Sequence, residues 1–211
     1  MAFDYDVATS TVCSSIHWVE DVLSKSNEFN FGTIEEEIKK LENEGIVVKN
    51  IICDVEEQPI ERPKNNQESH YSGKKKRHTT KNQIVVDEEK LKIINYYNDK
   101  ATTHDYKMLK DSNIICILNK LKIGGKFDSG YQGVQNELIS SSIPYKKSKY
   151  HKLTKEEKEY NKKLSSIRVR IEHVNRSLKI FRIMKEIYRN HQKRYDVKLK
   201  IMCVIYNMNL D

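Results

Sequence analysis

The stretch IVVKNIICD, residues 46–54, decides how the middle of the chain folds. Its two apolar triplets, 46–48 and 51–53, predict a buried β-strand that runs into Asp54. The segment that follows, residues 57–70, contains two prolines and many polar side chains, and it has the composition of a loop. The central part of the chain is therefore expected to begin with an interior strand that ends at a carboxylate.

Further strands are predicted directly downstream. Residues 71–86 indicate a strand pair or one long bent strand, and residues 91–96 indicate another strand after a polar turn at 87–89. Because short turns join successive antiparallel strands, this order favours an antiparallel meander.

The second half of the chain alternates helices and strands. A short helix is expected from about Asp105, a strand near 122–127 that stops at Asp128, and a weaker strand around 143–145. The tract 154–190 predicts a long one-sided helix, because its apolar residues step by three and four. These residues are Leu164, Ile167, Ile171, Val174, Leu178 and Phe181. Such an order of elements predicts a mixed α/β sheet with flanking helices.

Two helices are predicted before the first strand. Residues 9–24 have apolar side chains at helical spacing, and Thr9 and Ser10 are residue types that favour the N-cap position. Residues 33–44 are acidic and predict a connector helix that ends at Gly45.

The charge is distributed unevenly along the 211 residues, which carry a net charge of +8. Residues 141–211 hold 19 Lys or Arg against 7 Asp or Glu, whereas residues 1–140 hold 19 against 23. An A/T-rich genome would account for part of the lysine content, but not for this asymmetry. A basic C-terminal third indicates a polyanionic partner.

Several classes of protein are excluded by composition. The longest apolar run, residues 114–118, is far shorter than the roughly 20 residues that span a bilayer. The first ten residues carry two aspartates and lack the basic start of a signal peptide. The four cysteines form no Cys-x-x-Cys pair, and we interpret them as buried thiols in a reducing compartment. The chain is therefore predicted to be soluble and intracellular.

Three acids are candidates for chemistry. Asp54 follows an apolar strand, Asp128 ends another strand, and Glu172 lies inside the long helix. Acids at strand ends converge in α/β sheets, and phosphodiester cleavage uses such carboxylates to hold two divalent ions about 4 Å apart. Each acid taken singly is more often a turn cap or a solvated carboxylate.

Five short sequence motifs, in order along the chain, support the interpretation of these acids as catalytic residues. They are CDVEEQPIERP at 53–63, YSGKKKRHT at 71–79, HD at 104–105, DSGYQG at 128–133 and RVRIEH at 168–173. Together they resemble the motifs of bacterial insertion-sequence transposases with a DDE active site, in the branch related to eukaryotic Harbinger transposases. One departure is Glu56, where that family usually has threonine.

The resemblance implies a fold and an activity. The fold would be ribonuclease-H-like over residues 46–211, preceded by a partial helix-turn-helix and connector in residues 1–45. Asp54, Asp128 and Glu172 would be a catalytic triad that binds two Mg²⁺ or Mn²⁺ ions. The protein would cut transposon ends and join the 3′ hydroxyl to target DNA. Its partner would be double-stranded DNA, bound as a homo-oligomer in the bacterial nucleoid and without contact with a membrane.

The resemblance also implies where DNA is bound. The helix 9–24 resembles a recognition helix, and the chain starts inside that module, which predicts an N-terminally truncated copy. The predicted DNA-binding residues are Thr9, Ser10, Thr11, Ser14, Lys74, Lys75, Lys76, Arg77, Arg168 and Arg176.

Simpler interpretations remain open for several of these features. Glu172 has an arginine four residues to either side, Arg168 and Arg176, so it also fits an exposed helical ion pair. The run 74–78 also fits a solvated hairpin face, and His104-Asp105 fits a helix cap better than a fourth metal ligand. The alternative functions are a non-catalytic DNA-binding relic and a nuclease that does not transfer strands.

Overall fold

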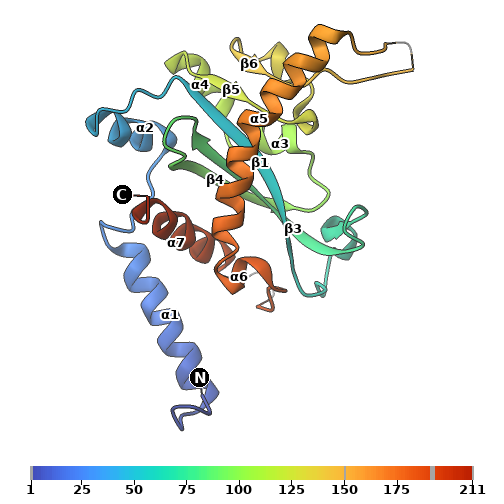
Figure 1. The fold of residues 1–211 in the computed structure, drawn as a ribbon. Helices are drawn as coiled ribbons and strands as arrows, with labels where there is room; N and C mark the ends of the chain where they lie inside the picture. Colours follow the sequence, from blue (N-terminus) through green and yellow to red (C-terminus); the bar gives the residue numbers. More distant parts are fainter. Residues whose placement is uncertain (1, 150, 191–192, 211) are drawn as a thin grey trace.

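A mixed β-sheet with helices on both faces forms the body of the protein (Figure 1). The computed structural model describes residues 2–149, 151–190 and 193–210. The strands of the sheet are β1 Asn50–Pro59, β2 Tyr71–Ser72, β3 Arg77–Asp87, β4 Ile93–Lys100, β5 Gly124–Lys126 and β6 Ser141–Ser142. The prediction of a mixed α/β sheet with flanking helices is confirmed.

The sheet combines an antiparallel half and a parallel half. Strand β3 pairs antiparallel with β1, β4 and β2, which confirms the predicted meander. On its other edge β1 pairs in parallel with β5, and β5 pairs in parallel with β6. Strand β1 therefore lies between a long antiparallel neighbour and a short parallel one.

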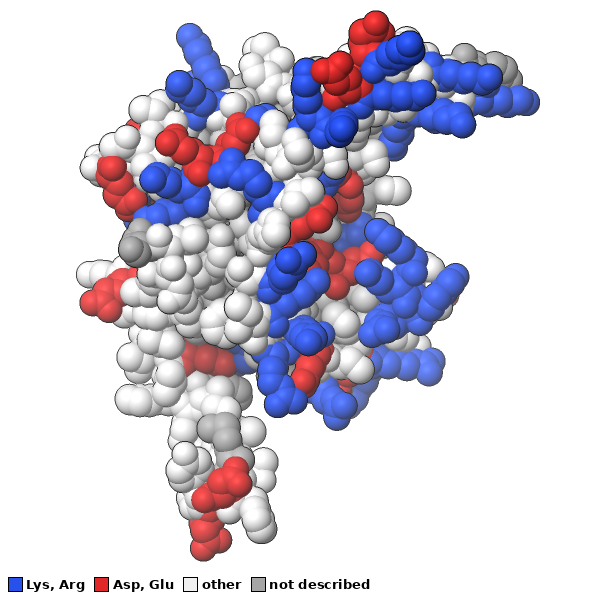
Figure 2. Space-filling model, viewed as in Figure 1, with Lys and Arg blue, Asp and Glu red and all other residues white. Residues whose placement is uncertain are grey.

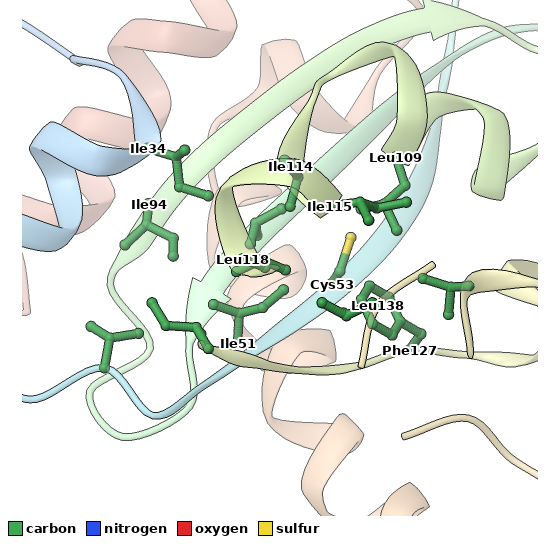
Figure 3. Packing of buried hydrophobic residues seen from close by; sticks show 14 of the residues in the cluster. Ile34, Ile51, Cys53, Ile94, Leu109, Ile114, Ile115, Leu118, Phe127 and Leu138 are labelled. Carbon is green, nitrogen blue, oxygen red and sulfur yellow. The ribbon is translucent and has the colours of Figure 1, made fainter. Parts of the chain in front are cut away.

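Two hydrophobic clusters lie on opposite faces of the sheet, because successive side chains of a strand point to opposite sides. Ile51 and Cys53 pack with helices α2 (Ile34–Asn43), α3 (Asp105–Asp111) and α4 (Ile114–Leu121), as Figure 3 shows. Ile52 packs with the C-terminal helices α5 (Lys155–Leu178), α6 (Arg182–Lys185) and α7 (Tyr195–Met208).

The helix boundaries follow from local chemistry. Helix α2 begins with a capping box between Thr33 and Glu36, and the chain leaves the helix through Gly45, whose φ of +82° favours glycine. Helix α5 begins with a second capping box, between Thr154 and Glu157.

Strand β1 differs from the prediction at both ends. It begins at Asn50, so the triplet 46–48 lies before it, and it continues to Pro59, so Asp54 lies inside the strand and not at its end. The reason is the long pairing with β3, from Ile51 opposite Asp87 to Pro59 opposite Thr79. Backbone pairing with a neighbour overrides the weak strand preference of the polar residues after Asp54.

The C-terminal region also differs from the prediction. The expected helix 154–190 ends at Leu178, and the chain turns before α6. Helix α7 was not predicted, because lysines alternating with apolar residues around 197–201 obscure its helical period. The strand predicted at 143–145 corresponds to β6, which begins two residues earlier, at Ser141.

Helix α1 (Thr9–Lys25) projects from the body and contacts it near its C-terminal end (Figure 1). Arg194 donates to Glu20 at 2.7 Å and to Asp21 at 2.6 Å, and Lys198 contacts Glu20 at 2.6 Å. The helix begins after Ala8 without a side-chain cap, so the prediction that Thr9 and Ser10 are N-caps is wrong. Residues 2–8, which precede it, form no helix.

Other expectations concern the boundary at residue 45, the cysteines and the membrane. Helix α2 packs in the same hydrophobic cluster as Ile51, through Ile34, Ile38 and Leu41. The predicted division into residues 1–45 and 46–211 stays a prediction. Two cysteines, Cys53 and Cys203, are buried, but Cys13 and Cys116 are exposed, which corrects the interpretation of all four as buried thiols. None of the helices in the described residues has the length and apolar character needed to cross a bilayer.

Candidate active site

A cavity of about 740 Å³ opens where β1, the β2–β3 hairpin, the segment after β5 and helix α5 meet. The three acids predicted from the sequence all line it: Asp54, Asp128 and Glu172. Its other lining residues are Val55, Glu56, Glu57, Lys74, Lys75, Lys81, Asp105, Asn175, Arg176 and Lys179. Acids that lie far apart in the sequence therefore share one cavity.

The parallel pairing of β1 with β5 brings the two aspartates together. Ile52 lies opposite Lys126, and each aspartate follows two residues later on its own chain segment. Asp54 and Asp128 therefore come at the same level of two neighbouring parallel segments. Asp128 also caps the short 3₁₀ turn after it, because its Oδ1 accepts a hydrogen bond from the Gly130 N–H at 2.7 Å.

Glu172 reaches the cavity from helix α5. Ile171, Val174 and Leu178 of this helix are buried in the cluster that includes Ile52, and they fix the helix against β1. Glu172 itself is exposed on the cavity side. Among the described residues it forms no ion pair with Arg168 or Arg176, so the exposed helical ion pair is not observed.

Asp54 is held by two side chains of helix α5. Its Oδ1 accepts from the Arg168 Nη2 at 3.3 Å, and its Oδ2 accepts from the Asn175 Nδ2 at 3.0 Å. Burial raises the pKa of Asp54 to about 6; Arg168 acts in the opposite direction, and the charges of Asp128 and Glu172 raise it further. A cation held among these acids would relieve that repulsion.

The donor set fits a divalent cation by its chemistry. Asp54, Asp128 and Glu172 offer carboxylate oxygens, which Mg²⁺ and Mn²⁺ prefer, and the buried Oδ1 of Asn175 has no hydrogen-bond partner among the described residues. In the described parts of the chain, however, no three acidic, histidine or cysteine side chains are already placed around one position. The acids must therefore move closer together to share an ion.

Asp105 is a further aspartate of the cavity, and it lies close to Asp128. Its Oδ1 accepts from the Lys81 Nζ at 2.8 Å, and its Oδ2 lies beside Gly130, where an added Cβ would be 2.5 Å from it and 2.9 Å from the Oδ1 of Asp128. His104 occupies the N-cap position of α3, but its side chain makes no capping hydrogen bond in the structure. The pair was expected to cap a helix, and its aspartate instead lines the cavity.

Glu56, the departure from the transposase motif, has a partner in the cavity. It forms an ion pair with Lys179, the C-cap residue of α5, one turn after Asn175. Burial raises the pKa of Glu56, and the hydrogen bond from Lys179 opposes that rise. Asn175 and Lys179 were missed by the sequence analysis, although they lie three and seven residues after Glu172 and so share its helix face.

The predicted DNA-binding residues are divided between several places. Lys74, Lys75 and Arg176 line the cavity, and Arg168 points to Asp54. Lys76 is exposed on the turn between β2 and β3, and Arg77 is exposed at the start of β3. The four residues of α1 are exposed and do not line this cavity: Thr9, Ser10, Thr11 and Ser14.

Positive charge borders the acidic region. Figure 2 shows one group of Lys and Arg side chains along the projecting end of α5 and a second group lower on the same side, with acidic side chains between them. Residues 145–163 contain eight lysines and three glutamates. A basic surface beside the cavity would raise the local concentration of a polyanion.

Comparisons with known proteins give the family. Residues 53–207, which include all three acids, match the family described as DDE superfamily endonuclease. The chain belongs to this family. It is also 37% identical over 210 residues to a protein of Microchaete diplosiphon described as "Probable transposase for insertion sequence element IS702". That match spans 100% of this chain and 74% of the relative.

Proposed function

We propose that this protein is the transposase of an insertion sequence, which cuts the ends of its element and joins the freed 3′ hydroxyl to target DNA. The observation that carries the proposal is that Asp54, Asp128 and Glu172, separated by many residues in the sequence, line one cavity. The name of the Microchaete diplosiphon relative supports the same function.

In this proposal the three acids hold two Mg²⁺ or Mn²⁺ ions. Two such ions, when bound, would supply activation of the attacking oxygen and stabilisation of the charge on the leaving oxygen. The protein contributes the placement of the acids: paired parallel segments carry Asp54 and Asp128, and the packed helix α5 carries Glu172. Lys74 and Lys75 at the edge of the cavity bind the flanking phosphates.

We also propose that the sheet is ribonuclease-H-like. Three antiparallel strands, β4, β3 and β1, are continued on the far edge of β1 by the parallel strands β5 and β6. This arrangement supports the fold that the transposase motifs imply. The partner would be double-stranded DNA, and the active form on DNA a homo-oligomer.

The role of α1 in reading DNA is a separate part of the proposal. The exposed residues Thr9, Ser10, Thr11 and Ser14 lie in its first turns, where a recognition helix presents side chains to the major groove. Its apolar residues Ile16 and Val19 are exposed. We therefore expect α1 alone to discriminate poorly between DNA sequences.

A plasmid assay tests the proposed function. The full chain is incubated with supercoiled DNA that carries the terminal repeats of its element, with Mg²⁺, with Mn²⁺ or with EDTA. Metal-dependent nicking at the repeat ends followed by joining to a second DNA supports a transposase. Cleavage without joining would indicate a nuclease without strand transfer, and DNA binding without cleavage would indicate a non-catalytic relic.

Substituting Gly130 by alanine should lower the cleavage rate by about a hundredfold, because small displacements of reacting groups cost that much. The new methyl group would push on the carboxylates of Asp105 and Asp128, whose flexible ends can move without disturbing the core. Nicking rates and thermal melting would be measured together. Gly73→Ala is the matched control, because a Cβ there meets no described atom within 4 Å. Equal nicking rates for both variants would contradict the prediction.

A further inference from the structure

One face of helix α5 is polar and lies against the polar part of β1. Arg168, Glu172, Asn175 and Lys179 follow one another at intervals of four, three and four residues, so they share this face. Asp54 and Glu56, two residues apart on β1, share the facing side of the strand. Arg168 and Asn175 contact Asp54, and Lys179 contacts Glu56.

These contacts occupy both oxygens of Asp54. The Arg168 Nη2 donates a hydrogen bond to Oδ1 at 3.3 Å, and the Asn175 Nδ2 donates one to Oδ2 at 3.0 Å. The side chains of Arg168 and Asp54 are both largely buried, with exposed fractions of 18% and 19%. A metal ion at Asp54 would lie close to the positive charge of the Arg168 guanidinium, so the two cations would repel each other and compete for one carboxylate.

Arg168 is incompletely satisfied in this position. Its contact with Asp54 is single and long, and its buried Nε has no hydrogen-bond partner among the described residues. A buried donor without a partner costs free energy. A phosphate oxyanion would accept two parallel hydrogen bonds from the same guanidinium, which is the geometry that arginine favours.

We propose that Arg168 is the internal counter-ion of Asp54 in the protein without metal or DNA, and that it moves to a DNA phosphate when a divalent ion takes its place. This inference rests on the proposed function of the cavity. Its consequence is that DNA and metal bind cooperatively: phosphate draws Arg168 away from Asp54, and metal at Asp54 releases Arg168 for phosphate. Each ligand must then strengthen the other by the same factor.

Binding of Mn²⁺ to the full chain, followed by electron paramagnetic resonance, tests this without requiring turnover. Titrations are made without DNA and with a random-sequence duplex that lacks the terminal repeats. For the unsubstituted protein we expect the duplex to tighten Mn²⁺ binding by about tenfold, within the usual range of such couplings. Arg168→Gln should bind Mn²⁺ about tenfold more tightly without DNA, and the duplex should then add clearly less.

Arg176→Gln is the matched control. Arg176 also lines the cavity, but it contacts no carboxylate among the described residues, so its variant measures the general effect of removing one positive charge. The gain in Mn²⁺ affinity should be clearly smaller than for Arg168→Gln. Thermal melting checks that each variant is folded, and Arg168→Met serves as a second variant if the glutamine proves unstable.

The outcomes separate the two proposals. Asp54→Asn should weaken Mn²⁺ binding; if it leaves binding unchanged, the metal site of the proposed function is wrong. If Asp54→Asn weakens binding but Arg168→Gln binds Mn²⁺ no more tightly than Arg176→Gln, the metal site stands and the counter-ion role of Arg168 is overturned. An undiminished effect of the duplex in Arg168→Gln would also overturn it.

Discussion

Replacing Asp128 by alanine should abolish DNA cleavage, a loss on the order of 10³-fold or more, since the carboxylate would help to hold the ions that stabilise the reacting oxygens. The fold should survive. Asp128 contributes one hydrogen bond, to the Gly130 N–H at 2.7 Å, and losing such a cap costs about 1 kcal/mol. The neighbouring Phe127 and Tyr131, which are fully buried, remain in place.

Cleavage of a plasmid in Mg²⁺ and chemical denaturation would be measured on the same preparations. Asp111→Ala is a suitable control, because Asp111 is an aspartate of α3 that pairs with Lys107 outside the cavity. It should cleave at the rate of the unsubstituted protein. If Asp128→Ala retained cleavage within tenfold, Asp128 would not be a metal ligand, and the proposed triad would be wrong.

Raising the salt concentration from 50 to 200 mM should weaken DNA binding by about a thousandfold if roughly six cations contact phosphates. Each neutralised phosphate contributes about −0.9 to the slope of log K against log salt. The candidate cations are Lys74 and Lys75 beside the cavity and the lysines within residues 145–163 of the sequence. Figure 2 shows two groups of Lys and Arg side chains on one side of the molecule.

Variants locate the contacts. Substituting both Lys74 and Lys75 by glutamine should reduce the magnitude of that slope by about 1.8, because two phosphate contacts are lost. Lys107→Gln should leave the slope unchanged, since Lys107 is paired with Asp111 on α3. Fluorescence anisotropy with a random duplex at several salt concentrations measures the slope. Binding that is insensitive to salt would show that the basic surface is only solvated.

Local chemistry allowed the sequence to predict much of the fold. Gly45 was predicted to end the helix 33–44, and in the structure it follows α2 with a φ of +82°, a backbone geometry that favours glycine. The sequence predicted either a strand pair or one long bent strand at residues 71–86, and another strand at 91–96 after the polar turn 87–89; the structure has the pair β2 and β3, followed by β4. These signals lie within one element, so they can be read without knowing which elements pack together.

Other features depended on contacts between distant segments. Strand β1 extends to Pro59 because β3 pairs with its polar half. Residues 55–59 alone give no indication that they pair with β3. Helix α1 was predicted correctly as a helix, but its attachment through Glu20 depends on Arg194 and Lys198, more than 170 residues away. Such pairings are decided by the packing of the whole chain.

The same division applies to the site. The sequence by itself determined which acids to consider, because Asp54, Asp128 and Glu172 occur in motif strings whose residue types suit phosphodiester chemistry. Only the tertiary structure decided their neighbours. The parallel pairing of β1 with β5 sets Asp54 level with Asp128, and the packing of α5 turns Arg168 and Asn175 toward Asp54. Electrostatic interactions depend on distance in space, so the counter-ion of Asp54, 114 residues away along the chain, is visible only in the folded protein.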